Sequence, residues 1–172
     1  MKKSIVLIVI LFIVSASNSY SQSFADRIHF EASAGAGAKY QCMRPMDITF
    51  KVNVDIVKKL YAYIAEENNH NLYKDGDFKT YYDSANLGGG LGVKLLDNDN
   101  TIHKLDLRAG VLSSLGNADW KHTTYGVGLA WYLGPKSRAF SPVVEMGYRY
   151  ADTHTEGMKN YSGFYMSIGL RY

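Results

Sequence analysis

The chain has 172 residues, a formal charge of +3 and one cysteine, Cys42. A charge this small, carried by scattered basic residues, argues against a nucleic-acid-binding protein, and a single cysteine excludes an intramolecular disulfide. The 14 tyrosines, 16 glycines and only 3 prolines are typical of an aromatic-rich all-β chain.

Residues 1–21 have the order of a secretory signal peptide. A short basic start, MKK, precedes an unbroken apolar run from Ile5 to Val14, and small polar residues follow it. The run is too short to cross a bilayer as a helix, which takes about 20 residues. Small side chains predict cleavage after Ser21, which leaves residues 22–172 as one domain. An N-terminal membrane anchor helix is the alternative interpretation.

Eight segments of the remaining chain alternate between apolar and polar or small side chains, with the period of two that defines a strand. In the fifth segment, for example, Leu105 and Leu107 alternate with Asp106 and Arg108. The facing of the third segment stays open because both of its phases carry apolar side chains. In chain order the predicted strands are 27–40, 46–54, 60–67, 85–96, 102–112, 122–133, 139–151 and 161–172.

The connections between these strands alternate in length. Residues 55–59, 97–101 and 133–139 are short, whereas the connections between them include the long, aromatic stretch 68–84. We therefore expect short turns at one end of the molecule and longer loops at the other. An amphipathic helix over residues 54–67 is an alternative, because this stretch also approaches a period of 3.6.

Eight alternating strands close into a barrel, and the depth of the aromatic residues indicates which face meets lipid. On the apolar phase, aromatic residues fall near both rims and aliphatic residues fall between them, as in a lipid-facing wall with aromatic girdles. A lipocalin-like barrel would place the apolar phase inside. Phe50, at mid-depth, departs from the pattern. The rim aromatics are Phe140, Trp131 and Tyr172 at one end, and Tyr40, Tyr125, Tyr148, Tyr150 and Phe164 at the other.

The opposite phase is then the barrel interior, and it carries charges of both signs. Charges that face lipid at mid-depth would cost about 2 to 4 kcal/mol each, whereas inside the barrel they can pair. An eight-stranded barrel is just wide enough for its side chains, so we expect a polar plug, with an ion or proton path as the alternative. The predicted network is Glu31, Lys51, Asp106, Arg108, Glu145, Arg149 and Arg171, with Lys94 and Lys104 on the same phase.

After the signal peptide, the alternating strands, the alternating connections and the terminal aromatic residue resemble the small OmpX/OmpA-type outer-membrane barrels of Gram-negative bacteria. The resemblance implies an all-β fold, a closed eight-stranded antiparallel up-and-down transmembrane β-barrel in the cell outer membrane. In that family the barrel-insertion machinery reads the last strand, and Ile168, Leu170 and Tyr172 match this signal. Ser167 stands where a glycine is often expected. The basic start and the predicted Gln22 also resemble exported proteins of the Bacteroidetes.

Catalysis is an alternative because small outer-membrane barrels include lipid A acylases and deacylases. A Ser/His/Glu hydrolase needs a hydroxyl and an imidazole within about 3 Å, and a group that orients the base. His122 and Thr124 share a face near the upper rim, with Ser113, Ser114 and Glu145 as candidate neighbours. Because the chain has no His-x-Ser pair, we expect no catalytic residues and no enzyme.

Metal sites and cofactors are not predicted either. The sequence DNDN at 97–100 resembles the start of a calcium loop, but the glycine and the twelfth-position glutamate are missing, so we interpret it as a hairpin turn. KDGD at 74–77 is interpreted as a turn for the same reason. The stretch 154–156 offers two potential ligands and no third.

Function is expected in the exposed loops or the lipid-facing wall. The stretch 68–84 mixes aromatic and charged residues, as contact surfaces do, although its tyrosines could instead fold back over the barrel mouth. The chain is therefore predicted to be a non-enzymatic outer-membrane barrel with a structural, docking or accessory-subunit role. Expected partners are outer-membrane lipid, lipopolysaccharide, the barrel-insertion machinery and another envelope protein, and no nucleic acid. The predicted loop contacts are Tyr73, Phe78, Tyr81 and Tyr82.

Overall fold

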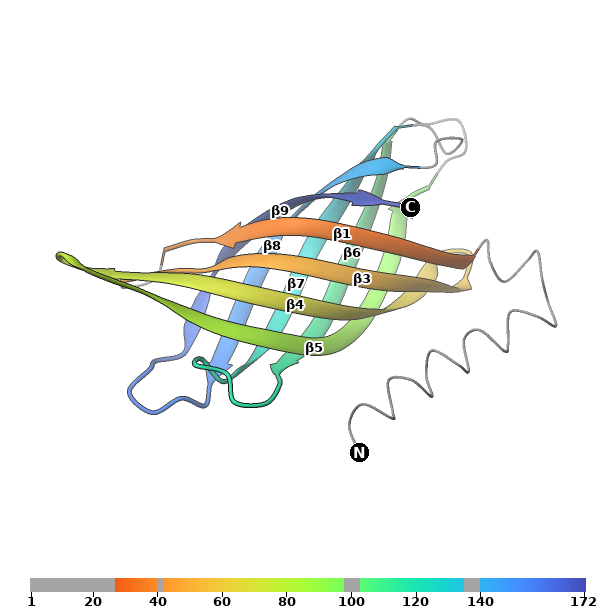
Figure 1. Ribbon diagram of the computed structural model, residues 1–172. Coiled ribbons are helices and arrows are strands. Elements are labelled where there is room, and N and C mark those ends of the chain that lie inside the picture. Colours follow the sequence, from red (N-terminus) through yellow and green to blue (C-terminus); the bar gives the residue numbers. More distant parts are fainter. Residues whose placement is uncertain (1–26, 40–41, 98–102, 135–139) are drawn as a thin grey trace.

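The computed structural model describes residues 27–39, 42–97, 103–134 and 140–172, which lie mostly in antiparallel strands (Figure 1). The predicted signal peptide lies outside the described residues. Among the described residues, no helix has the length and apolar character needed to cross a membrane. The strands in chain order are β1 (Ile28–Gly37), β2 (Met43–Arg44), β3 (Met46–Val57), β4 (Leu60–Asp75), β5 (Phe78–Leu96), β6 (His103–Ser114), β7 (His122–Leu133), β8 (Ser141–Thr153) and β9 (Tyr161–Arg171).

Eight long strands close into an antiparallel barrel, which confirms the predicted fold class. Around the wall the order is β4-β3-β1-β9-β8-β7-β6-β5, and β4 pairs with β5 to complete the ring. The first and last strands meet with Glu31 opposite Arg171. The two-residue strand β2, which the sequence did not predict, lies one residue before β3 and pairs Met43 with Tyr73 of β4.

The strand bounds agree with the alternation except in the predicted long loop. β7 spans the predicted 122–133, whereas 68–84 is no loop, because β4 and β5 continue through it to Asp75 opposite Phe78. Gly76 closes the turn with a φ of 58°, a left-handed conformation that glycine adopts without strain. The predicted KDGD turn is thus confirmed, and the hairpin that carries it projects beyond the other strands (Figure 1).

The helical alternative for residues 54–67 is wrong. Residues 58–59 form the turn between β3 and β4, and both flanking segments are strands. In β4, Tyr61 and Ala65 are buried in the interior while Ile64 is exposed on the outer wall. The strand therefore carries apolar groups on both faces, which is why the sequence left its facing open.

The two ends of the barrel differ, as Figure 1 shows. At one end, here named the loop end, lie the tip of the β4–β5 hairpin and the connections 115–121 and 154–160. At the opposite end, the turn end, lie the turn 58–59, the start of β1 and the end of β9. Most of the predicted short turns at 97–101 and 133–139 fall outside the described residues.

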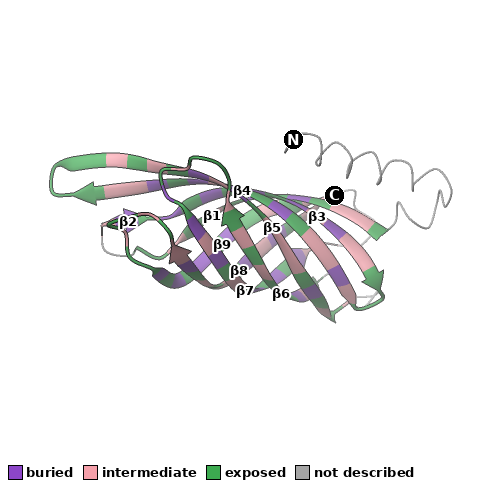
Figure 2. Ribbon diagram, turned by 90° about the horizontal axis from the view of Figure 1, so that it is seen from below, coloured by how far each residue is buried: buried purple, intermediate pink, exposed green. Residues whose placement is uncertain are grey.

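Side chains alternate between a mostly buried inner face and an exposed outer face along the strands (Figure 2). Each of the eight long strands exposes at least one large hydrophobic side chain, and aromatic rings pair near both rims. The ring centroids of Tyr148 and Phe164 lie 5.4 Å apart toward the loop end, and those of Phe140 and Tyr172 lie 5.3 Å apart at the turn end. Soluble barrels have the opposite arrangement, so the lipocalin-like alternative is wrong. Outward hydrophobics, one from each long strand, are Phe30, Phe50, Ile64, Leu91, Leu107, Val127, Met146 and Ile168.

Candidate functional site

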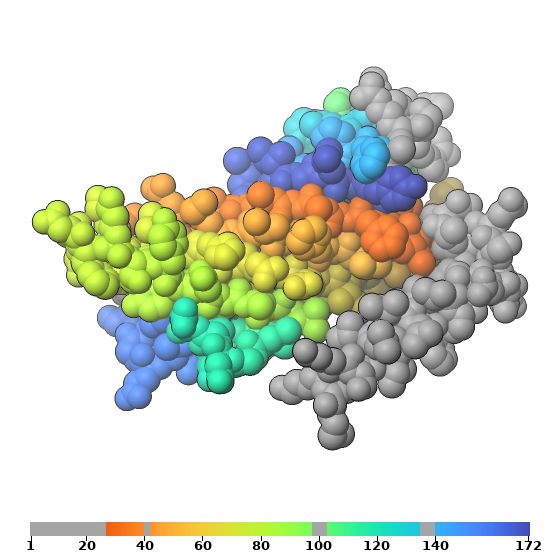
Figure 3. Space-filling view, viewed as in Figure 1, coloured from red at the N-terminus to blue at the C-terminus, as the bar shows by residue number. Residues whose placement is uncertain are grey.

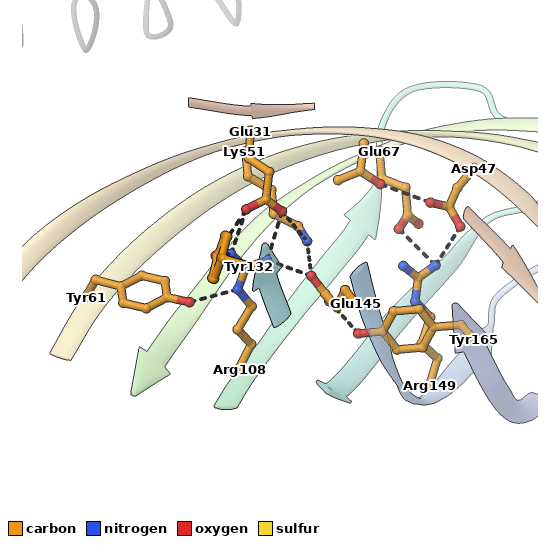
Figure 4. Close-up of polar contacts among 11 residues, drawn as sticks. Glu31, Asp47, Lys51, Tyr61, Glu67, Arg108, Tyr132, Glu145, Arg149 and Tyr165 are labelled. Carbon is orange, nitrogen blue, oxygen red and sulfur yellow. Dashed lines mark hydrogen bonds and ion pairs between the residues drawn. The ribbon is translucent and has the colours of Figure 1, made fainter. Parts of the chain in front are cut away.

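Four charged side chains from four strands meet inside the barrel, and they form what we name the central cluster (Figure 4). Arg108 of β6 donates two hydrogen bonds to Glu31 of β1, with nitrogen to oxygen distances of 2.9 and 2.7 Å. Its Nη1 also lies 2.6 Å from Oε2 of Glu145 on β8. Lys51 of β3 donates to the same Glu145 oxygen at 2.5 Å and lies 3.4 Å from Glu31. All four side chains are buried, and the two cations balance the two carboxylates.

Three tyrosines complete the hydrogen bonding of the central cluster. The Nε of Arg108 donates to the Tyr61 hydroxyl at 2.8 Å, and its Nη2 donates to the Tyr132 hydroxyl. The Tyr165 hydroxyl donates to Oε1 of Glu145 at 2.6 Å. Buried charges are costly unless they are paired and fully hydrogen-bonded. The tyrosines therefore let an ionic cluster replace a hydrophobic core in this interior.

A second group of charges, here named the upper cluster, lies nearer the loop end and consists of Asp47, Glu67 and Arg149. Nη1 of Arg149 lies 3.1 Å from Asp47 Oδ2 and 3.0 Å from Glu67 Oε2. The guanidinium carbon of Arg149 lies 3.9 Å from the ring centroid of Tyr165, within cation–π range. Because the hydroxyl of that tyrosine binds Glu145, Tyr165 connects the two clusters.

The seven predicted interior residues do not all pair directly with one another. Four of them make the central cluster, and Arg149 belongs to the upper cluster. Asp106 is buried, and within the described part of the chain its Oδ2 has no hydrogen-bond partner. Arg171 lies over the ring of Tyr132, 4.7 Å from its centroid, near the turn end. The inward direction of these side chains alone therefore did not predict which of them form ion pairs with one another.

Near the turn end, the two remaining interior lysines pair locally. Lys94 lies 2.6 Å from Asp55, which also lies 3.8 Å from the Nε2 of His29. Lys104 lies 3.4 Å from Asp97. The rest of the calcium-like motif at 97–100 falls outside the described residues. Among the described residues, no group of three or more His, Cys, Asp or Glu side chains is placed to hold a metal ion.

Asp47 and Glu67, the two acids of the upper cluster, were not among the predicted interior residues. Asp47 shares the polar phase of its strand with Lys51, so alternation alone could have placed it inside the barrel. Glu67 could not be assigned to the interior from the sequence, because it was not predicted which face of the segment 60–67 points inward. Its buried position follows from that of Tyr61 on the same phase, whose hydroxyl binds Arg108.

The interior holds little empty space. A cavity of about 30 Å³ lies between the two clusters and is lined by Lys51, Glu145 and Arg149 among others. Such a volume holds about one or two water molecules. Side chains therefore fill the part of the interior that the structure describes.

Among the described residues, no hydroxyl group is hydrogen-bonded to the ring of His122. Its Nδ1 lies 3.0 Å from the Trp120 carbonyl oxygen, and its Nε2 lies 3.3 Å from the Asn86 amide nitrogen. The ring also stacks on the Trp120 indole with centroids 3.9 Å apart. The Ser114 hydroxyl accepts from the backbone N–H of His122 rather than from its ring, and Glu145 is held in the central cluster. The candidate hydrolase residues are therefore not arranged as a triad.

The four predicted loop contacts lie on the β4–β5 hairpin and divide into two pairs. Tyr73 and Tyr82 meet edge to face with centroids 5.8 Å apart and fold back onto buried apolar side chains. Phe78 and Tyr81 are 61% and 63% exposed. The first pair thus folds back as the second interpretation predicted, whereas a contact role for the exposed pair stays a prediction. The buried side chains under the first pair are Met43, Trp120, Ala151 and Tyr161.

One edge of this hairpin is open. β6 pairs with β5 only as far as Ser114 opposite Asn86, and the following connection adds a backbone bond from the Asp119 N–H to the Asp83 carbonyl at 3.1 Å. In the described part of the chain, β5 from Phe78 to Tyr82 pairs with β4 on one side, and no strand lies on its other side, where β6 pairs with the later residues of β5. The projecting hairpin, in yellow-green, is visible in the space-filling view (Figure 3).

The three residues of the predicted insertion signal lie on the outer face at the end of β9. Ile168, Leu170 and Tyr172 are all exposed. The backbone of Tyr172 exchanges two hydrogen bonds with Phe30 of β1, with lengths of 2.7 and 2.9 Å. This part of the strand is therefore tied to the first strand while its apolar side chains face outward.

Comparison with known proteins does not name a family. No protein-family model matches the chain, and no curated protein matches it. Among solved structures, the outer membrane protein Ail of Yersinia pestis, determined in a phospholipid bilayer nanodisc, is similar with a TM-score of 0.45 and 12% identity. The similarity covers 84% of this chain and 99% of Ail. A similarity at this level of identity does not indicate a function for this chain.

Proposed function

We propose that this chain is a non-enzymatic outer-membrane barrel with a plugged interior, which holds the β4–β5 hairpin outside the cell as a docking surface. The observation that carries the proposal is the combination of an apolar outer wall with an interior filled by paired charges. The wall fits a lipid environment, and the filled interior does not fit a channel.

The outer wall supports a membrane location. Soluble monomers rarely expose contiguous apolar patches larger than a few hundred Å², whereas hydrophobic side chains stand outward on all eight long strands here. The closed ring pairs the backbone groups of neighbouring strands, as a bilayer requires. The rings of Tyr148, Phe164, Phe140 and Tyr172 lie toward the rims, where aromatic side chains anchor at membrane interfaces.

The predicted export signal and the even number of strands support the proposed outer-membrane location and the orientation of the barrel in that membrane. Bacterial barrels of this membrane have an even strand number, with short turns in the periplasm and longer loops outside. We therefore assign the turn end to the periplasm. Ile168, Leu170 and Tyr172 serve as the signal for the insertion machinery in this proposal, and lipopolysaccharide surrounds the loop end.

The hairpin supports a docking role. An open strand edge offers backbone N–H and C=O groups to a partner strand, and exposed aromatic side chains are common anchors in protein interfaces. Phe78 and Tyr81 lie at this edge, while Tyr73 and Tyr82 hold the base of the hairpin against the barrel. We propose another envelope or extracellular protein as the partner.

Orientation and plugging can be tested on one preparation. Trypsin added to intact cells should cut at the exposed Lys74 and Lys79 on the hairpin and spare Lys58 and Lys59 in the turn. The purified protein should show no steady conductance in planar bilayers, because the interior is filled. Cleavage at Lys58 and Lys59 alone would invert the orientation, and steady conductance would contradict the plug.

Docking can be tested with the double variant Phe78→Ser, Tyr81→Ser. Losing two aromatic anchors should reduce recovery of a cross-linked partner from gently solubilised outer membranes by roughly tenfold or more. Leu115→Ser is the matched control, because Leu115 is also an exposed apolar residue at the loop end. Equal recovery with the double variant and the control would remove the hairpin as the docking surface.

A further inference from the structure

Two β-bulges shape the turn end of the barrel on the side of β3 and β5. The pairing of β3 with β4 shifts between Asp55 and Val57, and the pairing of β5 with β6 shifts between Lys94 and Leu96. A bulge adds one residue to one strand of a pair and interrupts the strict alternation of faces. Consecutive aliphatic side chains are consequently exposed on both strands. These residues are Ile56 and Val57 on β3, and Leu95 and Leu96 on β5.

A groove of about 420 Å³ lies at this site. Leu95 and Leu96 form its apolar part, and Lys58 and Lys59 of the β3–β4 turn lie beside them. The volume falls in the range of about 300 to 1,000 Å³ that small-molecule sites occupy. A ligand here would meet an apolar wall and ammonium groups together.

The charge of the groove is positive on balance. Its one described acid, Asp97, lies 3.4 Å from Lys104, and Lys94 is paired with Asp55 at 2.6 Å. Lys58 and Lys59 are both exposed. The two turn lysines therefore remain to attract an anion.

The groove also differs from the rest of the turn-end rim. Elsewhere, aromatic rings occupy the rim, with the ring centroids of Phe140 and Tyr172 5.3 Å apart. His103 lines the groove on the side where that aromatic rim begins, and its ring centroid lies 5.4 Å from that of Trp131. Aromatic rings are general anchors at a membrane interface. Lysines beside an aliphatic surface instead match a lipid with an anionic head group, since the acyl chains take the aliphatic part and the phosphate takes the ammonium groups.

We infer that this groove binds an anionic phospholipid of the leaflet at the turn end. The phosphate lies between Lys58 and Lys59, and an acyl chain lies along Leu95 and Leu96. The inference rests on the membrane location in the proposed function, but it does not depend on docking by the hairpin. The bound lipid would hold the rim at the side where β3 and β5 bulge.

Native mass spectrometry of the full barrel tests the inference. The protein is exchanged from detergent into mixtures of phosphatidylglycerol and phosphatidylcholine with identical acyl chains. We expect phosphatidylglycerol to be retained roughly tenfold or more over phosphatidylcholine, because two lysines contact its charge. Lys58→Gln with Lys59→Gln should remove this preference. Lys121→Gln with Lys159→Gln is the matched control, since both lysines are exposed at the loop end.

Three results would overturn the inference. The first is equal retention of the two lipids, and the second is equal loss of preference in both pairs of lysine variants. The third is displacement of phosphatidylglycerol by millimolar inorganic phosphate, which would indicate an anion site without acyl contact. Leu96→Ser should weaken retention of phosphatidylglycerol while leaving the lysines in place. Partner recovery through Phe78 and Tyr81, measured separately from gently solubilised outer membranes, distinguishes failure of the lipid site from failure of docking.

Discussion

Glu145→Gln should lower the free energy of unfolding of the barrel by about 3 to 5 kcal/mol, the usual cost of breaking a buried ion pair. Oε2 of Glu145 lies 2.5 Å from the Lys51 ammonium and 2.6 Å from the Arg108 guanidinium. Without this carboxylate, two buried cations share the single charge of Glu31, and Lys51 is 3.4 Å away from it. Urea titration in phospholipid vesicles, followed by the heat-dependent mobility of the barrel on gels, measures the loss.

A double-mutant cycle shows whether the loss comes from the stranded charge. Lys51→Met removes the partner, so combining it with Glu145→Gln should cost less than the sum of the two single changes. In the double variant, Arg108 keeps its two hydrogen bonds to Glu31 and no ammonium is left unpaired. Glu156→Gln, in an exposed connection, is the control and should leave unfolding unchanged. Additive costs in the cycle would show that the two side chains act independently.

The alternation of side chains predicted the barrel because an apolar outer wall and a polar interior separate apolar from polar residues along each strand. The same reasoning fails toward the loop end. At residues 68–71 the chain reads NNHN, with polar groups on both phases, although β4 runs straight through it. Asn69 and Asn71 are buried and donate hydrogen bonds from their side chains, while Asn68 and His70 lie on the opposite phase. A strand with polar residues on both faces carries no hydrophobic period of two. The extended hairpin was therefore mistaken for a loop.

The composition of the interior could be predicted, but its connections could not. Glu31 and Lys51 are directly opposite in neighbouring strands, so register relates them once the pairing is known. Arg108 reaches Glu31 and Glu145 across the barrel lumen, and such contacts depend on strand tilt and stagger. Inward tyrosines added a second difficulty. Tyr61 reads as apolar in a binary pattern, yet its hydroxyl accepts from Arg108.

Gly92→Ala should destabilise the barrel by about 1 to 3 kcal/mol, the usual cost of overpacking a filled interior. A Cβ at position 92 would lie 2.1 Å from Cζ of Tyr61, much closer than any real contact. The Tyr61 ring is buried, and its hydroxyl accepts from Nε of Arg108 at 2.8 Å. To make room, the ring must move away from Arg108, so the substitution disturbs the central cluster as well as the packing.

Gly126→Ala is the matched control for this effect. Both glycines lie on the inward phase of a strand, but the nearest atom to a Cβ at 126 is Cγ of Arg149 at 3.8 Å, an ordinary contact. Alanine there should be neutral or slightly stabilising, because it reduces the freedom of the unfolded chain without strain in the folded one. Urea titration of both variants in the same vesicles compares them directly. If Gly92→Ala unfolds at the same urea concentration as Gly126→Ala, the Tyr61 ring is free to move, and it does not hold Arg108 in place.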